Sequence, residues 1–477
     1  MPHRKISRAS PELINIIHKV SATCNITNFE HVIHFGSDDV DSNTDGYYKV
    51  SLKGCRDGQR VRWNYIIKWH CDPKRRSLFR EAYKREVLFF NKIVPSYLEI
   101  QRSFRLIEGL KIKFPNCYYA SAEWNEEVLV FASPYAQGFR LHDRLATLGL
   151  DHVSLVMKNL AKLHALSFVF EKYQPVEFEE IRKACSNDLQ YSDVKLIPKS
   201  MITYYDASVN VVKDEKAKKL LKHYASYILQ ILNKSAMPIR RKHLVICHGD
   251  CWNNNVMYKF QKENPVDIMF IDNQLTRYAS PVTDLSYYLY MSTDQQFLSA
   301  HYDRMVNLYY NNLSAILRQF NLEPNDFYPE HVFLQDLKDY SVLGLIEALV
   351  SMKIITALPE EAIKMAGLKY GDDYSEDGTY CNEDQTCNSY VERPINVPTA
   401  GAQAFPMDGI GRLGHDPPRG PSADWRVLTT ADAAGTNGLT CLPKHGGTRD
   451  RRFLATHPMT AAERVNHLRH RPPHIFA

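Results

Sequence analysis

No stretch of this 477-residue chain approaches ~18 uninterrupted apolar residues, the length that a membrane-spanning helix requires. The most apolar long segment, residues 340–359, carries Glu347 and Lys353, and we expect it to be a buried helix. Residues 1–20 also lack the continuous apolar core of a secretory signal. Their apolar residues follow the spacing of an amphipathic helix instead, at Leu13, Ile14, Ile17 and Val20. The sequence therefore predicts neither a membrane span nor a signal peptide.

The ten cysteines lack any repeated spacing, so the sequence indicates no disulfide framework. We expect reduced thiols and a cytoplasmic location. Cys247, His248 and Cys251 lie close enough together to raise the question of a zinc site. Such a site needs a second ligand pair with matching spacing, and Cys381 with Cys387 is a poor one. Zinc is therefore the less favoured interpretation.

Residues 401–477 contain none of the 28 tyrosines, but they hold 9 of the 21 glycines and 8 of the 24 prolines. Ten basic and six acidic residues there give a net charge of +4, which leaves +1 for the first 400 residues. Because the basic excess lies in this tail, the composition does not indicate a nucleic acid partner. Glycine and proline without periodicity argue against a packed core. The sequence predicts a disordered tail at residues 396–477, whether native, fused or an artefact of the gene model.

The first 395 residues show strand patterns with one helical segment, followed by mostly helical patterns. Two strand-like stretches flank "CRDGQ" at residues 55–59, and a helix is predicted at 76–94. Residues 152–170 form a second predicted helix, with Asp151 as a candidate N-terminal cap. Further on, "RKHLVIC" predicts a buried strand, and "VMYKF" and "VDIMFID" predict a hairpin. The polar octet "HGDCWNNN" at residues 248–255 is thus expected to be a loop held between strands.

The octet reduces to His248-x-Asp250-x₄-Asn255, a spacing that suits phosphoryl transfer. That reaction needs a carboxylate to accept the proton of the acceptor hydroxyl and an oxygen nearby to bind a metal ion. Asp250 and Asn255 meet these two needs. Asp272, at the end of the next predicted strand, can supply a second metal ligand. Oxygen donors of this kind favour Mg²⁺.

A kinase also needs a cation for the nucleotide phosphates and an anion that holds this cation in place. Lys68 ends the predicted strand "YIIK", and Glu86 lies in the helix that follows. Each residue alone is most simply a solvated charge. Their order along the chain, followed by Asp250, Asn255 and Asp272, is the order that kinases use.

Two further polar residues are predicted to support the site rather than to react. Asp284 precedes a helix, so it could be an N-terminal cap. We favour a buried aspartate that hydrogen-bonds the octet and holds Asp250 in place. His248 is assigned to structural support as well. His164, on the apolar face of a predicted helix, is expected to be a buried histidine with a hydrogen-bond partner.

These motifs resemble the ecdysteroid-kinase-like (CHK kinase-like) proteins, within the superfamily of choline kinases and aminoglycoside phosphotransferases. That family's blocks read approximately HGDxWxxNxM and IDFQxxRxxxPxxDLxxFL, and here they stand as "HGDCWNNNVM" and "IDNQLTRYASPVTDLSYYL". The resemblance also includes "VLVFASPYAQGF", which matches a hinge written VLVxEDLxxxGF, and "YVER" at residues 390–393. It covers about residues 25–395.

The resemblance implies an α+β, two-lobed protein-kinase-like fold with a β-rich N-lobe at residues 1–131 and a mainly helical C-lobe at 132–395. It implies ATP and Mg²⁺ as cofactors, Asp250 as catalytic base, and Asn255 and Asp272 as metal ligands. Lys68 and Glu86 would anchor the phosphates. Residues 131–135, with Phe131 and Ser133, would line the adenine.

The implied function is a small-molecule kinase that phosphorylates a hydroxyl of a steroid-like or other apolar metabolite, with the acceptor pocket shaped by residues 171–240 and the helices after 290. A protein kinase is less favoured, because Asp272 is followed by Asn273 and Gln274 instead of Phe-Gly and a long activation segment. The alternative is a pseudokinase that binds a ligand or nucleotide without transfer. The altered hinge at Ala132 and Ser133 and the few glycines near residues 35–50 favour that alternative.

Overall fold

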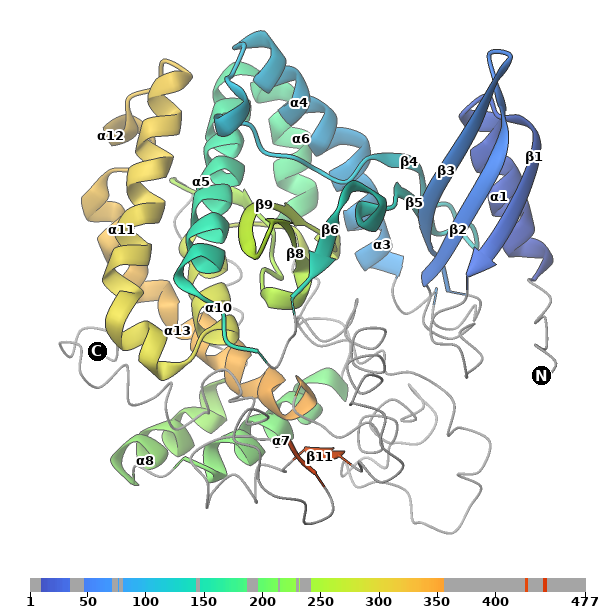
Figure 1. The fold of residues 1–477 in the computed structure, drawn as a ribbon. Helices are drawn as coiled ribbons and strands as arrows, with labels where there is room; N and C mark the ends of the chain where they lie inside the picture. The colour runs from blue at the N-terminus through green and yellow to red at the C-terminus, as the bar shows by residue number, and fades with distance from the viewer. Residues whose placement is uncertain are drawn as a thin grey trace.

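The computed structural model describes residues 10–34, 47–70, 76, 80–142, 146–186, 196–212, 215–228, 231, 242–355, 425–427 and 441–443. The helix α1 (Pro11–Thr23) opens the described chain, as its amphipathic spacing predicts. Its apolar face lies against a five-stranded antiparallel sheet in the order β1-β2-β3-β5-β4 (Figure 1). The strands are β1 (Thr27–His34), β2 (Tyr47–Arg56), β3 (Gln59–Lys68), β4 (Cys117–Ser121) and β5 (Val128–Ala132).

The β2–β3 hairpin turns at Asp57 and Gly58, which both have positive φ, 50° and 77°. Positive φ at both turn positions suits the right-handed twist of a two-residue hairpin. The register then places Tyr47 opposite Lys68, at the end of β3. Behind this edge the chain continues through α3 (Arg80–Leu88), the π-helical turn η2 (Phe89–Ile93), α4 (Val94–Ser103) and the 3₁₀ turn η3 (Glu108–Leu110).

Residues after β5 lead into two small sheets between the lobes. One has the order β6-β8-β9, and the other pairs β7 with β10. These strands are β6 (Phe139–Leu141), β7 (Val245–Cys247), β8 (Val256–Gln261), β9 (Asn264–Phe270) and β10 (Arg277–Ala279), with the 3₁₀ turns η4 (Pro134–Gln137), η6 (Asn253–Asn255) and η7 (Asn273–Leu275). The predicted hairpin β8–β9 is confirmed.

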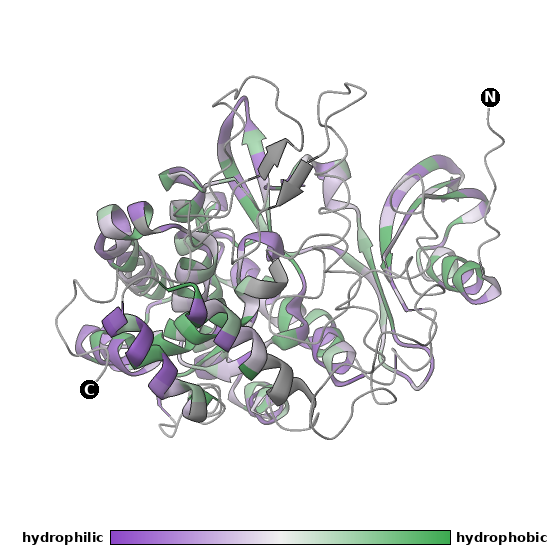
Figure 2. Ribbon diagram, turned by 90° about the horizontal axis from the view of Figure 1, so that it is seen from below, coloured by the Kyte–Doolittle hydropathy of each residue, from purple (hydrophilic) through white to green (hydrophobic). Residues whose placement is uncertain are grey.

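Helices make up the rest of the larger lobe, and their hydrophobic residues lie where the helices meet, with hydrophilic residues on the outer turns (Figure 2). They are α5 (Leu150–Tyr173), α6 (Pro175–Cys185), α7 (Leu196–Asn210), α8 (Glu215–Tyr224) with η5 (Ala225–Tyr227), α10 (Val282–Ser292), α11 (Gln295–Gln319), α12 (Pro324–Phe327) and α13 (Glu330–Ile355). α10 and α13 cross closely at Gly344, where an added Cβ would lie 2.3 Å from the Ser286 carbonyl carbon.

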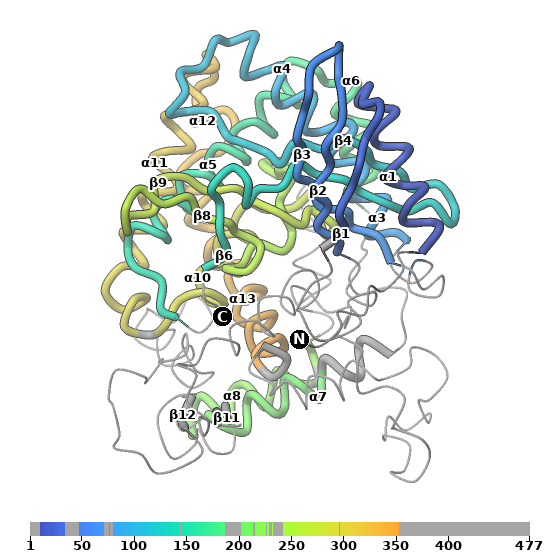
Figure 3. Tube along the Cα trace, turned by 45° about the vertical axis from the view of Figure 1, so that its right-hand side comes forward, coloured from blue at the N-terminus to red at the C-terminus, as the bar shows by residue number. Residues whose placement is uncertain are grey.

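The two lobes have separate apolar cores. The smaller core joins α1 to one face of the five-stranded sheet, and the larger core runs from α3 and α4 through α5, α10, α11 and α13. In the tube view, β1, β2 and β3 lie side by side, with α1 next to them and α3 near one end (Figure 3). The two-lobed α+β fold predicted from the sequence is thereby confirmed.

Among the described residues, α5 alone is long and apolar enough to cross a membrane, and 78% of its most apolar window is buried inside the protein. This is the pattern of a core helix. The sequence prediction for its start was wrong in one detail. Gly149 is the cap residue, and Asp151 lies within the first turn. Asn159, a polar residue in the middle of this helix, is buried as well.

Beyond residue 355, two short strands are described, β11 (Trp425–Val427) and β12 (Cys441–Pro443), and they pair antiparallel. The prediction of disorder for residues 396–477 otherwise lies outside the described residues, as does "YVER". The proposed lobe boundary at 131/132 stays a prediction.

Candidate active site

The octet forms a loop, residues 248–255, that follows β7 and leads into β8. Gly249 has a φ of 86°, a left-handed conformation that favours glycine. An added Cβ at this position would lie 1.8 Å from the Leu275 carbonyl oxygen. Glycine therefore allows the loop to pack directly against the segment that follows Asp272.

Asp250 lies within this loop and is fully buried, at 0% exposure. Its Oδ2 accepts a hydrogen bond of 3.0 Å from Asn255 Nδ2, which also donates to the Asp250 carbonyl at 2.9 Å. Its Oδ1 has no hydrogen-bond partner among the described residues. Burial raises the pKa of Asp250 well above its ordinary value, and the negative charge of Asp272 adds to this rise, whereas the Tyr287 hydroxyl opposes it. A buried carboxylate with an open oxygen and a raised pKa has the properties of a proton acceptor.

Two bonds to Ile271 join the loop to the end of β9. Ile271 N donates to Asn255 O at 3.0 Å, and His248 Nε2 lies 3.0 Å from Ile271 O. Asp272 follows directly, with φ 64° and ψ 66°, a left-handed conformation that is strained for a non-glycine residue. Asp250, Asn255 and Asp272 therefore come together in one place, as the sequence spacing suggests.

Oxygen atoms from two distant parts of the chain surround the Lys68 ammonium group. Nζ lies 2.6 Å from Glu86 Oε2, 2.8 Å from Asp272 Oδ1 and 3.3 Å from Gln274 Oε1. The second oxygen of Glu86 accepts a 3.1 Å bond from Asn273 N. One buried network thus links β3 and α3 of the small lobe to the segment after β9.

The ammonium group of Lys68 keeps its charge at neutral pH. Burial alone would lower the pKa of Lys68, but the carboxylates of Asp272 and Glu86 outweigh burial and raise that pKa well above its ordinary value. Burial raises the pKa of Asp272 to about 6, against the opposing effect of Lys68. Lys68 therefore stays protonated, and a fixed ammonium group of this kind suits phosphate oxygens.

Asp284 fixes the start of the loop through its main-chain amides. It accepts hydrogen bonds from His248 N at 2.7 Å and Gly249 N at 3.0 Å, and His164 Nε2 lies 3.1 Å from it. The other ring nitrogen of His164 lies 2.8 Å from the Tyr309 hydroxyl. Asp284 lies in the first turn of α10, but it bonds the loop rather than capping the helix.

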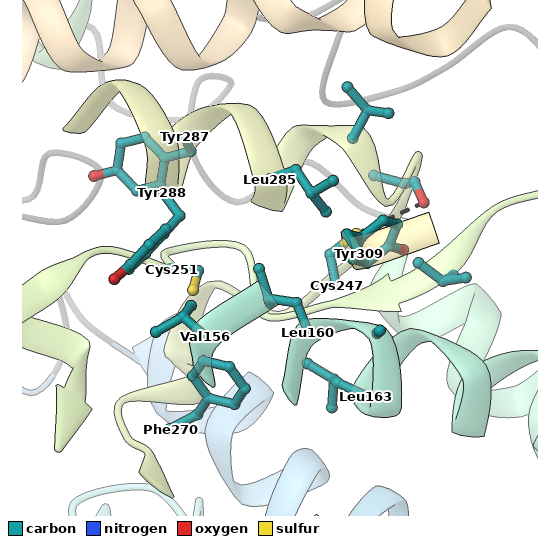
Figure 4. Packing of buried hydrophobic residues seen from close by; sticks show 14 of the residues in the cluster. Val156, Leu160, Leu163, Cys247, Cys251, Phe270, Leu285, Tyr287, Tyr288 and Tyr309 are labelled. Atoms are coloured by element: carbon teal, nitrogen blue, oxygen red, sulfur yellow. Dashed lines mark hydrogen bonds between the residues drawn. The ribbon is translucent and has the colours of Figure 1, made fainter. Parts of the chain in front are cut away.

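An apolar floor supports this polar network. Side chains from α5, α10, β9 and the loop pack together, and the Tyr309 ring lies close to Cys247 (Figure 4). The floor includes Val156, Leu160, Leu163, Cys251, Phe270, Leu285, Tyr287 and Tyr288. Polar bonds above a low-dielectric floor are stronger than the same bonds in water. The floor therefore fixes the loop as well as burying it.

The hinge residues Phe131 and Ser133 lie at the end of β5. Phe131 pairs with Ile66 of β3, and its ring stands edge-on to Phe90, with centroids 4.8 Å apart. Ser133 N donates to Asn64 O at 2.9 Å. Phe131 therefore lies on β5 and Ser133 directly after it, two and four positions from Leu129, which pairs with Lys68.

Asn255 and Asp272 are the candidates for binding a divalent ion. Because Asn255 Nδ2 donates to Asp250, its Oδ1 is the atom left for a metal, and Asp272 adds a carboxylate. Such oxygen donors fit Mg²⁺. One ligand atom each of His164, Cys247 and Asp284 also lies within 4.8 Å of the others. The bonds that Asp284 accepts explain that cluster without a metal.

Sequence reasoning missed several residues of the site. Gln274 contacts Lys68, and its position two residues after Asp272 was a usable signal. Arg85 Nη1 donates to Thr276 O at 2.5 Å and so joins α3 to the same segment. No local pattern indicated the Arg85 bond, because it depends on how α3 packs.

A model of the ecdysteroid kinase-like family matches residues 46–322 of the chain. No curated protein matches it. Among solved structures, Plasmodium vivax ethanolamine kinase is 11% identical with a TM-score of 0.34, covering 73% of this chain and 86% of that one. A microcompartment-associated aminopropanol kinase is 13% identical with a TM-score of 0.34, covering 71% and 98%. A glucosamine kinase in complex with glucosamine, ADP and phosphate is 14% identical with a TM-score of 0.31, covering 73% and 87%. At these TM-scores they add no weight to a functional assignment.

Proposed function

The chain belongs to the ecdysteroid kinase-like family, and from this premise we propose that it transfers the γ-phosphate of ATP to a hydroxyl of a small molecule. The observation that carries the proposal is the convergence of Asp250, Asn255 and Asp272 beside the anchored Lys68. These residues supply a proton acceptor, metal-binding oxygens and a fixed cation. Phosphoryl transfer needs all three.

Lys68 binds the phosphates of ATP in this proposal, with Glu86 holding the ammonium group in place. Asn255 Oδ1 and Asp272 would hold Mg²⁺, which would neutralise charge on the phosphates. Lys68 Nζ lies 2.8 Å from Asp272, so the phosphate-binding cation and the metal-binding carboxylate are neighbours. One triphosphate can therefore contact both.

Asp250 is the catalytic base. Its open Oδ1 accepts the proton of the acceptor hydroxyl as the hydroxyl oxygen forms a bond to the γ-phosphorus. The bond between that phosphorus and the bridging oxygen breaks, and ADP leaves. Asn255 holds the other carboxylate oxygen, so Asp250 presents a fixed edge to the acceptor.

A steroid-like or other apolar alcohol is the acceptor class that we propose. The family assignment suggests an ecdysteroid, and α13, which packs against both α10 and α7, is the helix that we propose to line the acceptor pocket. An apolar body would replace the water that Asp250 otherwise needs, which strengthens electrostatic interactions within the site.

A transfer assay with γ-labelled ATP and Mg²⁺ tests the proposal, with ecdysteroids, other sterols and plant phenolics as acceptors. We expect one of these classes to be labelled by the wild type. Asp250→Asn should lower kcat by about 10²- to 10⁴-fold, the usual contribution of a general base. The matched control is Asp267→Asn, an aspartate on β9 that pairs with Lys113 away from the loop. It should keep full activity.

Two outcomes would contradict this function. If Asp250→Asn transfers phosphate as fast as the wild type, Asp250 is not the base. If the wild type binds ATP but labels no acceptor, the chain is a binding module of the pseudokinase kind.

A further inference from the structure

In the hinge, residues 132–138, most of the backbone N–H groups donate hydrogen bonds to acceptors within the protein. All of these residues are described. Four of the amides have acceptors within the chain, namely Ala132 N to Asn116 O (2.8 Å), Ser133 N to Asn64 O (2.9 Å), Ala136 N to Ser133 O (3.1 Å) and Gly138 N to Tyr135 O (3.1 Å). The hinge therefore offers a ligand few donors.

Pro134 removes a further donor from the middle of this segment. Proline has a carbonyl acceptor but no N–H. Pro134 begins the 3₁₀ turn η4, where a missing N–H costs the turn nothing. The turn alone therefore explains why proline is tolerated here, but its effect on a ligand is separate. At Ser133 and Pro134, two consecutive positions, no amide hydrogen is left for a ligand.

The register of the sheet places this segment beside the base of a nucleotide bound at Lys68. Ala132 lies opposite Tyr65, three residues before Lys68. At ~3.3 Å per residue, the hinge lies roughly 10 Å from Lys68 along the strand. A nucleoside with its first phosphate can bridge that span.

The face of the sheet that carries Lys68 is apolar at the level of the hinge. Side chains alternate along a strand, so Ile66 shares the face of Lys68, and Phe131 lies opposite Ile66 on that same face. The other face, with Tyr65 and Ile67, packs against α1. Ile66 and Phe131 therefore form an apolar surface that can cover the flat face of a base.

The Watson–Crick edge of adenine presents one acceptor, N1, and one donor group, the N6 amine. A backbone segment that reads both needs an N–H and a C=O. We propose that this hinge holds the base by apolar contact and carbonyl acceptors, with N1 left unbonded, and that Pro134 is the residue that determines this. The inference rests on the proposed nucleotide site. It makes Pro134 a specificity residue for the base.

Binding of nucleotide analogues to the full-length protein tests the inference without knowledge of the acceptor. The dissociation constants of Mg·ATP, Mg·1-deaza-ATP and Mg·7-deaza-ATP are measured by competition with a fluorescent ATP analogue. The 1-deaza compound lacks the N1 acceptor, and the 7-deaza compound keeps it and serves as control. The wild type should bind ATP and 1-deaza-ATP with equal affinity, within twofold.

Pro134→Ala restores an N–H at the hinge. In this variant ATP should bind about three- to tenfold more tightly than 1-deaza-ATP, the range expected for one neutral hydrogen bond. The ratio of ATP to 7-deaza-ATP should be the same in both proteins. Because each ratio is taken within one protein, a general loss of stability in the variant does not change it.

A wild type that binds ATP at least fivefold more tightly than 1-deaza-ATP would overturn the inference, because another amide, such as that of Tyr135, would then reach N1. A ratio of one in Pro134→Ala would overturn it too, because position 134 would not face N1. Failure of the wild type to bind any of the three nucleotides would instead contradict the proposed function.

Discussion

Two buried aspartates belong to the site, one within the loop from His248 to Asn255 and one beside it, and they differ in how many hydrogen bonds they accept. Asp284, beneath the loop, accepts two main-chain hydrogen bonds and contacts His164. Asp250, within the loop, leaves Oδ1 without a partner among the described residues. Both are 0% exposed.

The pKa shifts of the two groups have opposite signs. Burial alone would raise the pKa of Asp284, but the hydrogen bond from His164 and the electrostatic effects of the nearby basic side chains outweigh burial and lower it. Burial raises the pKa of Asp250, and few bonds compensate it. Asp284 therefore stabilises the fold in its ionised form, whereas ionised Asp250 costs stability. Asp250 is thus held in place indirectly, because Asp284 accepts hydrogen bonds from the residues that precede Asp250 in the loop.

Removal of the Asp284 carboxylate should have the largest effect on the stability of the protein. Asp284→Ala leaves the amides of His248 and Gly249 buried without an acceptor, so we expect the free energy of unfolding to fall by about 3–5 kcal/mol. Urea denaturation at neutral pH measures this. A fall of less than 1 kcal/mol would show that the loop does not depend on Asp284.

Distortion of the loop at Gly249 should cause the next largest loss of stability. Gly249→Ala places a Cβ against the Leu275 carbonyl, whereas Gly58→Ala has the same sign of φ with no atom within 4 Å of the new Cβ. Gly249→Ala should therefore destabilise the protein by about 1–3 kcal/mol more than Gly58→Ala, from overpacking alone. Equal melting temperatures for the two variants would contradict the close packing at Gly249.

The substitution Asp250→Asn should raise the free energy of unfolding, whereas the two substitutions above lower it. The folded-state pKa of Asp250 is raised, so its ionisation destabilises the protein as pH rises above about 4, the pKa of an unfolded aspartate. The variant should be more stable than the wild type at pH 7, and this gain should vanish near pH 4. Denaturation of both proteins from pH 4 to 8, without nucleotide, measures the difference. A variant less stable than the wild type at pH 7 would contradict the proposed cost of the charge.

Asp284 should show the opposite pH dependence. Its folded-state pKa is lowered, so the stability it contributes is present above about pH 4 and is lost as pH falls through the folded-state value. The difference between wild type and Asp284→Ala should therefore shrink as pH falls below about 4, where the gain from Asp250→Asn has already vanished.

The smallest loss of stability is expected for Tyr309, at the end of the hydrogen-bonded chain from Asp284 through His164. Tyr309→Phe removes the hydroxyl that lies 2.8 Å from His164 Nδ1 and should cost about 0.5–1.5 kcal/mol, the value of one hydrogen bond. Phosphate transfer should fall only slightly, because Asp284 still accepts both loop amides. A loss of transfer as large as that of Asp250→Asn would show that Tyr309 is part of the catalytic machinery.

Local features of this site could be predicted because they depend on local sequence. The turn residues Asp57 and Gly58 mark the hairpin that delivers Lys68, and the spacing from Asp250 to Asn255 lies within one loop. Such patterns need only backbone geometry and the chemistry of neighbouring residues.

Features that depend on packing between distant elements could not be predicted. Gln274 contacts Lys68 only because α3 brings Glu86 against the turn after Asp272. The sequence pattern of α10 or of α13 alone does not indicate that the two helices cross at Gly344. The cap of α5 was also misassigned, because the cap geometry is set by the preceding chain and not by the most capable side chain.

Mg²⁺-dependent binding of ATP tests the central claim most directly. Calorimetric titration of ATP into the wild type and into Asp272→Asn, each with and without Mg²⁺, compares the metal's contribution in the two proteins. The account predicts that Mg²⁺ tightens binding to the wild type at least tenfold and that Asp272→Asn loses this gain. An equal gain in both proteins would contradict the placement of the metal between Asn255 and Asp272.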